Sequence, residues 1–282
     1  MSTILVTGAS GFIGSALSAG LAADHQVIAM SRSTVDLPGV THVTGEFWSF
    51  EALRQLDKWS FDAVIHLAAE LRGPERDFVT VNGEGSRCLM RYLIDRGCRK
   101  FVMASSIAAI GCQSVQFRPE VLPIPDEHPC HDLHGYGFSK FIMEEITKYY
   151  WRQNREIDVI NIRLCSVIPG DDPTRKPEGL RPILQWTVGN VTCMLLSDAI
   201  RAFSLAVLTP LKPGVRILNT AAERIWATVP TADFLENWWG NGVDLSYFRR
   251  PGNEFGGVYR VDRLREELDF TAVDTLDYLE NM

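Results

Sequence analysis

Residues 4–17 have the sequence ILVTGASGFIGSAL, and this stretch decides how the rest of the chain is interpreted. Its four apolar or β-branched residues predict a short buried strand, and the later run of apolar and small residues predicts a helix. Gly8, Gly11 and Gly14 lie between the two with the spacing GxxGxxG. Glycines permit a tight turn there, and the free N–H groups and the dipole of a helix N-terminus attract phosphate. The pattern favours a phosphate-binding turn, although a glycine-rich turn without a ligand produces the same local signal.

The apolar N-terminus raises a second interpretation, a secretion signal. No Lys or Arg precedes Arg32, so the positive region of a signal peptide is missing, and no segment approaches the length needed to span a bilayer. The six cysteines form no CxxC pair, which predicts reduced thiols rather than a disulfide or zinc framework. We therefore expect a cytoplasmic protein with no membrane partner.

Composition narrows the class of protein. A chain of 282 residues with 46% hydrophobic content can form one large domain, or one domain with a cap. A net charge of −7 without a basic cluster argues against a nucleic-acid partner. His128, His131 and His134 lie in a proline-rich loop without the helical spacing of zinc motifs, so no metal site is expected.

The order of elements after the glycine stretch predicts the fold. Further strands are expected at 26–31, 40–47, 63–69 and 100–106, and helices at 49–58 and 77–96. Strands alternating with helices predict an α/β fold, a doubly wound parallel Rossmann sheet with helices on both faces. We assign it to residues 1–165, and assign to 166–282 a small substrate-binding cap interwoven with the end of the sheet. Ligands bind beyond the carboxyl ends of such strands, where the glycine turn also lies, so the turn is interpreted as a dinucleotide site.

The chemistry is expected where the 100–106 strand ends and where the next helix begins. The strand ends in ASS, and the later motif YGFSK places Tyr136 and Lys140 four residues apart, on one face of a helix. A neighbouring ammonium and an oxidised nicotinamide both lower the pKa of a phenol. A serine hydroxyl can hold the substrate oxygen while a hydride moves to or from the cofactor. The alternative is an amphipathic helix whose Tyr and Lys are ordinary surface residues.

TGASGFIG, HLAA, ASSIAAIG, YGFSK and IRLCSVIPG, in this order, resemble the extended short-chain dehydrogenases/reductases, which include NAD(P)-dependent epimerases and dehydratases. The resemblance implies that Tyr136 donates or accepts the proton and that Lys140 binds the nicotinamide ribose and lowers the tyrosine pKa. It also implies that Ser106 orients the reacting oxygen, with Ser105 aligning one step early, and that Asn82 is the family's structural asparagine. The cofactor-binding residues that it implies are Gly8, Ser10, Gly11, Phe12, Ile13, Gly14, Arg32, Glu46, Phe47, Leu67, Ala68, Ala69, Tyr136, Lys140 and Val167.

The end of the second strand bears on the choice of cofactor. NAD-binding members normally place an acidic residue there to hold the ribose 2′-hydroxyl, whereas this chain has Arg32, which suits a 2′-phosphate. We therefore predict NADP as the cofactor, with NAD possible if Arg32 is solvated and Asp36 turns inward. Glu46 matches the family's acidic residue near the adenine, with Phe47 packed beside it.

Two departures from the family pattern bear on the substrate. Ile107 and Ala108 follow Ser106 where the dehydratases resemble one another in an acidic pair, so dehydration is not expected. Val191 replaces the arginine that grips the diphosphate in nucleotide-sugar enzymes, which favours a smaller substrate.

The predicted function is NAD(P)-dependent hydride transfer between nicotinamide and an alcohol or carbonyl of a small molecule, for example a sugar derivative. An epimerase that retains its nicotinamide, and a non-catalytic NADP-binding regulator, are the alternatives. The helices at 77–96 and 136–152 have apolar faces that predict a homodimer, unless those faces only cover the sheet.

Overall fold

A single parallel sheet organises the protein. The structure is a computed structural model that describes residues 1–114, 116–170 and 192–273. Seven strands pair in the order β3-β2-β1-β4-β5-β6-β9. They are β1 (Thr3–Thr7), β2 (Gln26–Ser31), β3 (Val40–Thr44), β4 (Ala63–His66), β5 (Lys100–Ser106), β6 (Asp158–Leu164) and β9 (Gly214–Thr220). The strand order reverses between β1 and β4, which is where ligands bind in sheets of this kind.

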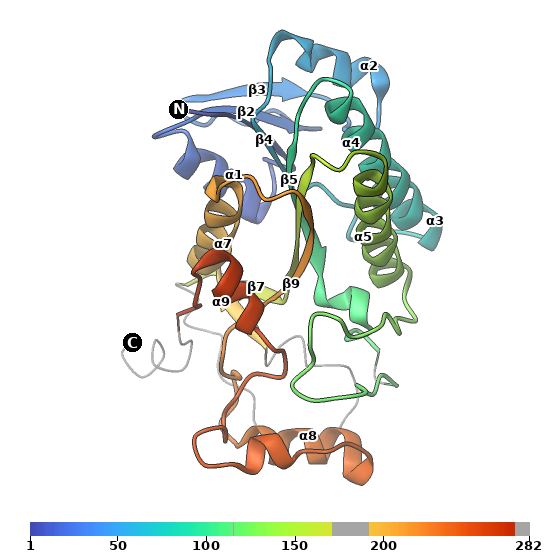
Figure 1. Ribbon diagram of the computed structural model, residues 1–282, viewed down its shortest axis with the longest axis vertical. Coiled ribbons are helices and arrows are strands. Elements are labelled where there is room, and N and C mark those ends of the chain that lie inside the picture. The colour runs from blue at the N-terminus through green and yellow to red at the C-terminus, as the bar shows by residue number, and fades with distance from the viewer. Residues whose placement is uncertain (115, 171–191, 274–282) are drawn as a thin grey trace.

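Helices cover both faces of the sheet (Figure 1). One face carries α1 (Phe12–Leu21), α7 (Leu196–Leu208) and α9 (Asp262–Leu268), and the other carries α2 (Phe50–Leu53), α4 (Ser86–Ile94) and α5 (Gly135–Gln153). Alternate residues of a strand point to opposite faces, so Ile4 and Val6 belong to one buried core and Leu5 to the other. The predicted doubly wound sheet is confirmed.

Several predicted elements end earlier or change type. The strand expected at 40–47 ends at Thr44, and the strand expected at 63–69 ends at His66. The last β1–β4 pair is Thr7 with His66, so the chain beyond His66 is free to turn over the edge of the sheet. The two predicted helices are each divided into segments of different helix type. The one expected at 77–96 consists of α3 (Glu75–Asp77), the π-helical η2 (Phe78–Gly85) and α4, and the one at 49–58 consists of α2 and the 3₁₀ helix η1 (Arg54–Lys58).

The second half of the chain completes the sheet. Strand β9 pairs in parallel with β6 along its whole length, from Gly214 opposite Asp158 to Thr220 opposite Leu164. A separate pair of short strands follows β6 directly, β7 (Ser166–Ile168) with β8 (Cys193–Leu195). Helix α8 (Thr231–Trp239) lies away from the sheet, beyond the carboxyl ends of the strands (Figure 1). Both predicted segments, 1–165 and 166–282, therefore contribute to the sheet.

A buried ion cluster lies near the starts of β5, β6 and β9, at the end of the strands away from the glycine turn. Asp158 at the start of β6 accepts a hydrogen bond from the Lys100 ammonium at 3.2 Å and pairs with Arg216 of β9. Lys100 also donates to the Thr209 carbonyl at 2.7 Å, after helix α7. Since the chemistry lies at the other end of the strands, this cluster serves the fold.

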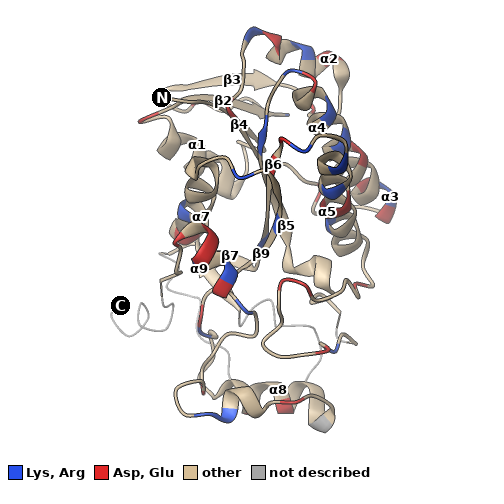
Figure 2. Cartoon of the chain, in the orientation of Figure 1, with Lys and Arg blue, Asp and Glu red and all other residues tan. Residues whose placement is uncertain are grey.

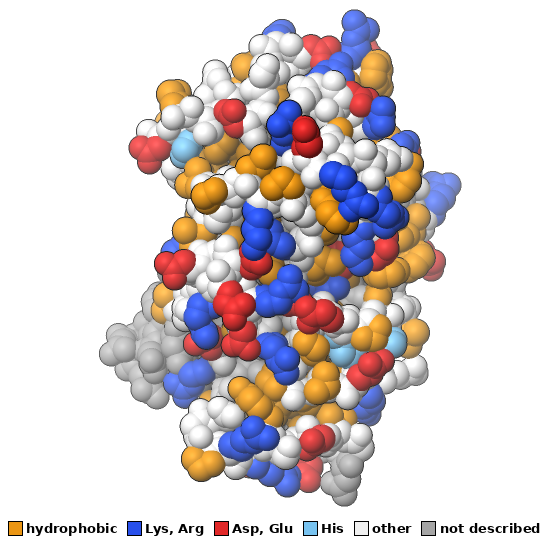
Figure 3. Space-filling view, viewed as in Figure 1, with side chains coloured by type: hydrophobic (Ala, Val, Ile, Leu, Met, Phe, Trp, Pro, Cys, Tyr) orange, Lys and Arg blue, Asp and Glu red, His pale blue; other side chains and the backbone are white. Residues whose placement is uncertain are grey.

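Charges of both signs are distributed over the elements (Figure 2) and are interspersed on the face drawn in Figure 3. Within the described parts of the chain, no helix has the combined length and apolar character that crossing a membrane requires.

Candidate active site

The glycine turn joins β1 to α1 and packs closely against neighbouring backbone atoms. Gly8 has a φ of +76°, and a β-carbon there would come within 2.6 Å of the Ala68 nitrogen after β4. A β-carbon on Gly14 would lie 2.2 Å from the Gly8 carbonyl oxygen. Neither position therefore accepts a side chain without displacing backbone, because 3.0 Å is already closer than real β-carbons come. The turn lets the N-terminus of α1 face a cavity, which is the cradle that a pyrophosphate needs.

That cavity, which we call the dinucleotide cavity, has a volume of about 220 Å³. Predicted residues on its wall are Gly8, Ser10, Gly11, Arg32, Phe47, Leu67, Ala68 and Ala69. Wall residues that sequence reasoning missed are Met30, Ser31, Gly45, Trp48, Glu70, Leu71 and Val81. Most of these directly flank a predicted residue, so extending each motif by one or two positions finds them.

Seven predicted cofactor-binding residues lie outside this wall: Phe12, Ile13, Gly14, Glu46, Val167, Tyr136 and Lys140. Phe12 is half exposed at the start of α1, Ile13 and Gly14 turn toward the helix and its packing, and Glu46 is exposed. Val167 lies in the small sheet, on β7, and lines neither cavity of the site.

The Phe47 side chain is buried, so its ring does not present a whole face to a ligand. Its ring packs edge-on against His66 at a centroid distance of 4.7 Å and against Trp48 at 4.9 Å. Asp36 is exposed and is not part of the cavity wall, whereas Arg32 is.

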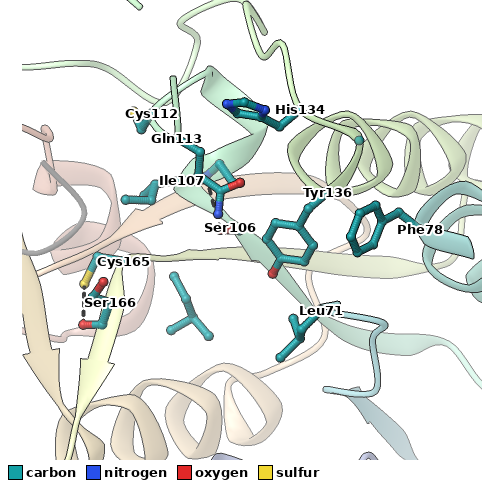
Figure 4. A pocket seen from close by; sticks show the side chains of 13 residues that line it. Leu71, Phe78, Ser106, Ile107, Cys112, Gln113, His134, Tyr136, Cys165 and Ser166 are labelled. Carbon is teal, nitrogen blue, oxygen red and sulfur yellow. Dashed lines mark hydrogen bonds between the residues drawn. The ribbon is translucent and has the colours of Figure 1, made fainter. Parts of the chain in front are cut away.

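A larger cavity of about 830 Å³, the reaction cavity, adjoins the first through Leu71, which lines both. Ser106 and Tyr136 are on its wall, and the Tyr136 hydroxyl points into it (Figure 4). Strand β5 ends at Ser106, and Tyr136 lies in the first turn of α5, so the sheet edge and the helix start bring these residues together. Phe78 packs edge-on against the Tyr136 ring at 6.1 Å.

Lys140 lies one turn further along α5, buried behind Tyr136. Its ammonium donates a hydrogen bond to the Ala104 carbonyl of β5 at 2.7 Å and lies 5.7 Å from the centre of the Tyr136 ring. Burial lowers the pKa of Lys140 to about 8, and the Glu144 carboxylate acts in the opposite direction. Burial raises the pKa of Tyr136 to about 12, with a smaller lowering by its hydrogen bond with Ser106. In the protein alone, burial therefore favours the protonated phenol, which is a proton donor.

Ser105, the neighbouring serine, forms its hydrogen bond away from the reaction cavity. Its hydroxyl is buried and donates to Glu144 Oε1 at 2.6 Å, on the side of β5 that faces α5. Ser106 therefore remains as the hydroxyl on the cavity wall.

Glu144 also forms a buried ion pair beneath the catalytic helix. Arg163 of β6 donates to both carboxylate oxygens of Glu144 at 2.8 Å, and donates a further bond to the Asp126 carbonyl at 2.8 Å. The pair ties α5 to the sheet and to the loop that precedes α5. Sequence reasoning missed it, because nothing local links position 144 to position 163.

A second network runs from the glycine turn to α5 through His66. The His66 ring is buried, and burial, followed by the nearby Lys140 charge, lowers its pKa to about 3, so it is neutral. Ser86 donates to the Asn82 carbonyl at 2.6 Å, so it must accept from His66 Nε2 at 2.9 Å. His66 Nδ1 then accepts from the Thr7 hydroxyl at 2.7 Å.

The chain of donors continues to the catalytic helix. Asn82 Nδ2 donates to Ser139 Oγ at 2.9 Å, and Ser139 donates to the Tyr136 carbonyl at 2.6 Å. Asn82 therefore has the structural role that the resemblance implies, and the first turn of α5 is fixed relative to the β1 end.

The described wall of the reaction cavity carries no charged side chain. Ile107, Ala108 and Leu164 are apolar, and Gln113 and His134 add polar groups. His128 and His131 hydrogen-bond within the loop, to the Pro129 carbonyl and to Glu120, and no three potential ligands converge on a metal position among the described residues. Val191 lies outside the described residues.

The sheet, the glycine turn and the Ser106–Tyr136–Lys140 arrangement define an enzyme of the extended short-chain dehydrogenase/reductase class. The model of the NAD dependent epimerase/dehydratase family matches residues 4–199, and the chain belongs to this family.

Known proteins similar to the chain agree with this class. UDP-glucose 4-epimerase from Mus musculus is 29% identical over 98% of this chain and 94% of the mouse protein. UDP-glucose 4-epimerase 2 from Arabidopsis thaliana is 27% identical, over 65% of this chain and only 59% of the plant protein. A short-chain dehydrogenase/reductase superfamily structure from Agrobacterium tumefaciens with bound NAD has a TM-score of 0.74 at 21% identity, covering 99% of this chain and 95% of that one.

Proposed function

We propose that the protein transfers a hydride between a nicotinamide dinucleotide and an alcohol or carbonyl carbon of a small, sugar-like substrate. The observation that carries this proposal is that Ser106 and Tyr136 face one cavity, which adjoins the cavity above the glycine turn. The glycine turn fits a dinucleotide, because Gly8 and Gly14 occupy positions where any side chain would collide with the backbone. When bound, the nicotinamide supplies or accepts the hydride.

The residues of the chain supply proton transfer and orientation. In the reducing direction, the protonated Tyr136 hydroxyl donates its proton to the oxygen of the substrate carbonyl. Ser106 donates a hydrogen bond to the same oxygen and holds it in reach. The Lys140 ammonium stabilises the phenolate that remains, since it is buried within the same helix face and water cannot screen it. Oxidation uses the reverse steps, with the phenolate as base.

Arg32 supports NADP as the cofactor, with NAD possible. Arg32 lines the dinucleotide cavity, and its guanidinium would hold a 2′-phosphate by charge-assisted hydrogen bonds. Asp36, the alternative partner for a ribose hydroxyl, is exposed and off the cavity wall, which favours Arg32 as the contact.

An epimerase is the second candidate, favoured by the names of the similar proteins, UDP-glucose 4-epimerases. It would use the same residues twice, once to oxidise and once to reduce, without releasing the cofactor. Dehydration is disfavoured, because Ile107 and Ala108 next to Ser106 have no acidic or basic group.

The experiment that separates the two candidates starts from the cofactor content of the purified protein. Denatured protein is assayed for nicotinamide, and the native protein is incubated with UDP-glucose and with small sugars while nicotinamide absorbance is followed. Net reduction or oxidation supports the oxidoreductase, and interconversion of sugars without net redox change supports the epimerase. Dinucleotide binding without turnover of any alcohol or carbonyl would leave the non-catalytic regulator as the surviving interpretation.

We also propose a homodimer and a cytoplasmic location. Phe138 and Tyr149 of α5 are close to half exposed, which supports an interface on that helix, whereas Leu89 and Leu93 of α4 face the core. Light scattering at micromolar concentration tests the dimer. No disulfide joins cysteines within the described residues, which supports a reducing compartment.

A further inference from the structure

Two opposite charges meet across the dinucleotide cavity. Arg32 follows β2 and Glu70 follows β4, the two strands that flank β1 and its glycine turn. Both side chains line the cavity, and Arg32 Nη1 lies 4.0 Å from Glu70 Oε2. The pair therefore spans the same cavity in which a dinucleotide would lie.

Glu70 is the fixed member of this pair. Its backbone N–H donates to Asn82 Oδ1 at 2.7 Å, and its carbonyl accepts from Asn82 Nδ2 at 3.0 Å. Its carboxylate oxygen Oε1 accepts the backbone N–H groups of Leu71 and Arg72, each at 3.1 Å. Those contacts leave Oε2 facing Arg32.

Arg32 is the movable member. Its side chain is 66% exposed, against 25% for that of Glu70, and 4.0 Å is longer than a hydrogen bond. An exposed guanidinium on a flexible stem can turn to another anion at little cost, while the anchored carboxylate stays in place.

We propose that Glu70 is a cofactor-specificity determinant, which limits the preference that Arg32 gives the protein for the phosphorylated dinucleotide. A 2′-phosphate bound to Arg32 must draw the guanidinium away from Glu70, and it meets the negative charge of that carboxylate. A ribose 2′-hydroxyl has no charge to repel and can donate a hydrogen bond to a carboxylate. This inference rests on the proposed dinucleotide function, and it predicts a protein that accepts both cofactors rather than one that selects NADP strongly.

The test is a set of binding titrations with NADPH and NADH. In Glu70→Gln the amide oxygen still accepts the Leu71 and Arg72 N–H groups, but the charge is gone. NADPH should bind about three- to tenfold more tightly, the size expected for a partly exposed ion pair, and NADH should bind equally or more weakly. In an Arg32→Ala background, Glu70→Gln should change NADPH affinity by only about twofold or less, because screened repulsion alone remains.

Glu51→Gln is the matched control. Glu51 is exposed on α2 and off the cavity wall, so this variant also loses one negative charge and should leave both affinities unchanged. Glu70→Ala, checked by thermal unfolding, should repeat the gain for NADPH if the glutamine variant folds poorly.

Two results would overturn the inference: equal changes for the two cofactors in Glu70→Gln, or the same NADPH gain with and without Arg32. A wild-type protein that binds neither cofactor would instead refute the proposed function, so the two failures are distinguishable.

Discussion

His66 should make the stability of the protein depend on pH in a way that a single variant can isolate. Its pKa is lowered from 6.5 to about 3 by burial and by the Lys140 charge. Between these two values the unfolded chain binds a proton that the native chain does not. The stability from a neutral His66 is therefore fully present above pH 6.5, and it is lost as the pH falls toward 3.

The magnitude follows from the span of pH. Each pKa unit corresponds to about 1.4 kcal/mol, so lowering the pH from about 7.5 to about 4.5 should cost about 2.7 kcal/mol through His66 alone. Other groups titrate in the same range, and they do not all act in the same direction. Burial raises the pKa of Asp126 to about 6, so the native state gains relative stability as Asp126 protonates. The wild-type curve by itself is therefore not diagnostic.

The assay compares the wild type with His66→Gln by urea unfolding across this pH range. Gln has no titrating group, and its amide can still donate toward Ser86, so the variant loses a roughly constant amount of stability but none of the His66 slope. The difference in unfolding free energy should shrink by about 2.7 kcal/mol between the two ends of the range. Parallel curves would mean that His66 is not held neutral by its buried contacts with Thr7 and Ser86, and the assigned tautomer would then be wrong.

Three further variants test other parts of the structure. Tyr136→Phe should lower turnover by about a hundredfold or more while leaving dinucleotide affinity intact, because only the proton donor is removed, and steady-state kinetics with a cofactor titration check both. Glu144→Ala should destabilise the protein by about 3–5 kcal/mol in urea unfolding, since the buried Arg163 guanidinium loses its counter-charge. Asp158→Asn should also lower the unfolding free energy, by leaving Lys100 without its carboxylate, but kcat of the folded fraction should be unchanged, because the cluster lies at the opposite end of the sheet.

The parts of the fold that the sequence predicts are those set by local signals. The runs at 26–31 and 100–106 coincide with β2 and β5, because an apolar run bounded by polar residues has one stable position in a sheet buried on both faces. Tyr136 and Lys140 are placed correctly on one helix because a spacing of four residues fixes their relative direction. Ser106 is on the cavity wall because it ends its strand.

The parts that escape sequence reasoning depend on contacts between distant segments. The end of a parallel strand is set by its partner, so the residues after His66 become loop although Leu67, Ala68 and Ala69 are as apolar as the strand before them. The orientation of a side chain beyond a strand has no periodic signal, so the sequence does not show that Glu46 is exposed and off the cavity wall. Glu70 follows HLAA immediately in the sequence, but its position opposite Arg32 across the cavity is visible only in the structure.

The residues proposed for proton transfer are held by other contacts than the residues that shape the wall of the reaction cavity. This separation explains how the fold can keep its chemistry while its substrate changes. Ser106 and Lys140 are held by β5, and Tyr136 by a helix start that is fixed through the Asn82–Ser139 bonds and, further along α5, through Glu144. None of these holding contacts involves Gln113, a loop residue on the wall of the reaction cavity. Substitutions in that wall can therefore alter which alcohol or carbonyl fits without moving the proton donor. An exchange such as Gln113→Leu should accordingly shift KM among substrates and leave kcat for the best of them nearly constant, since it changes binding rather than the proton-transfer geometry.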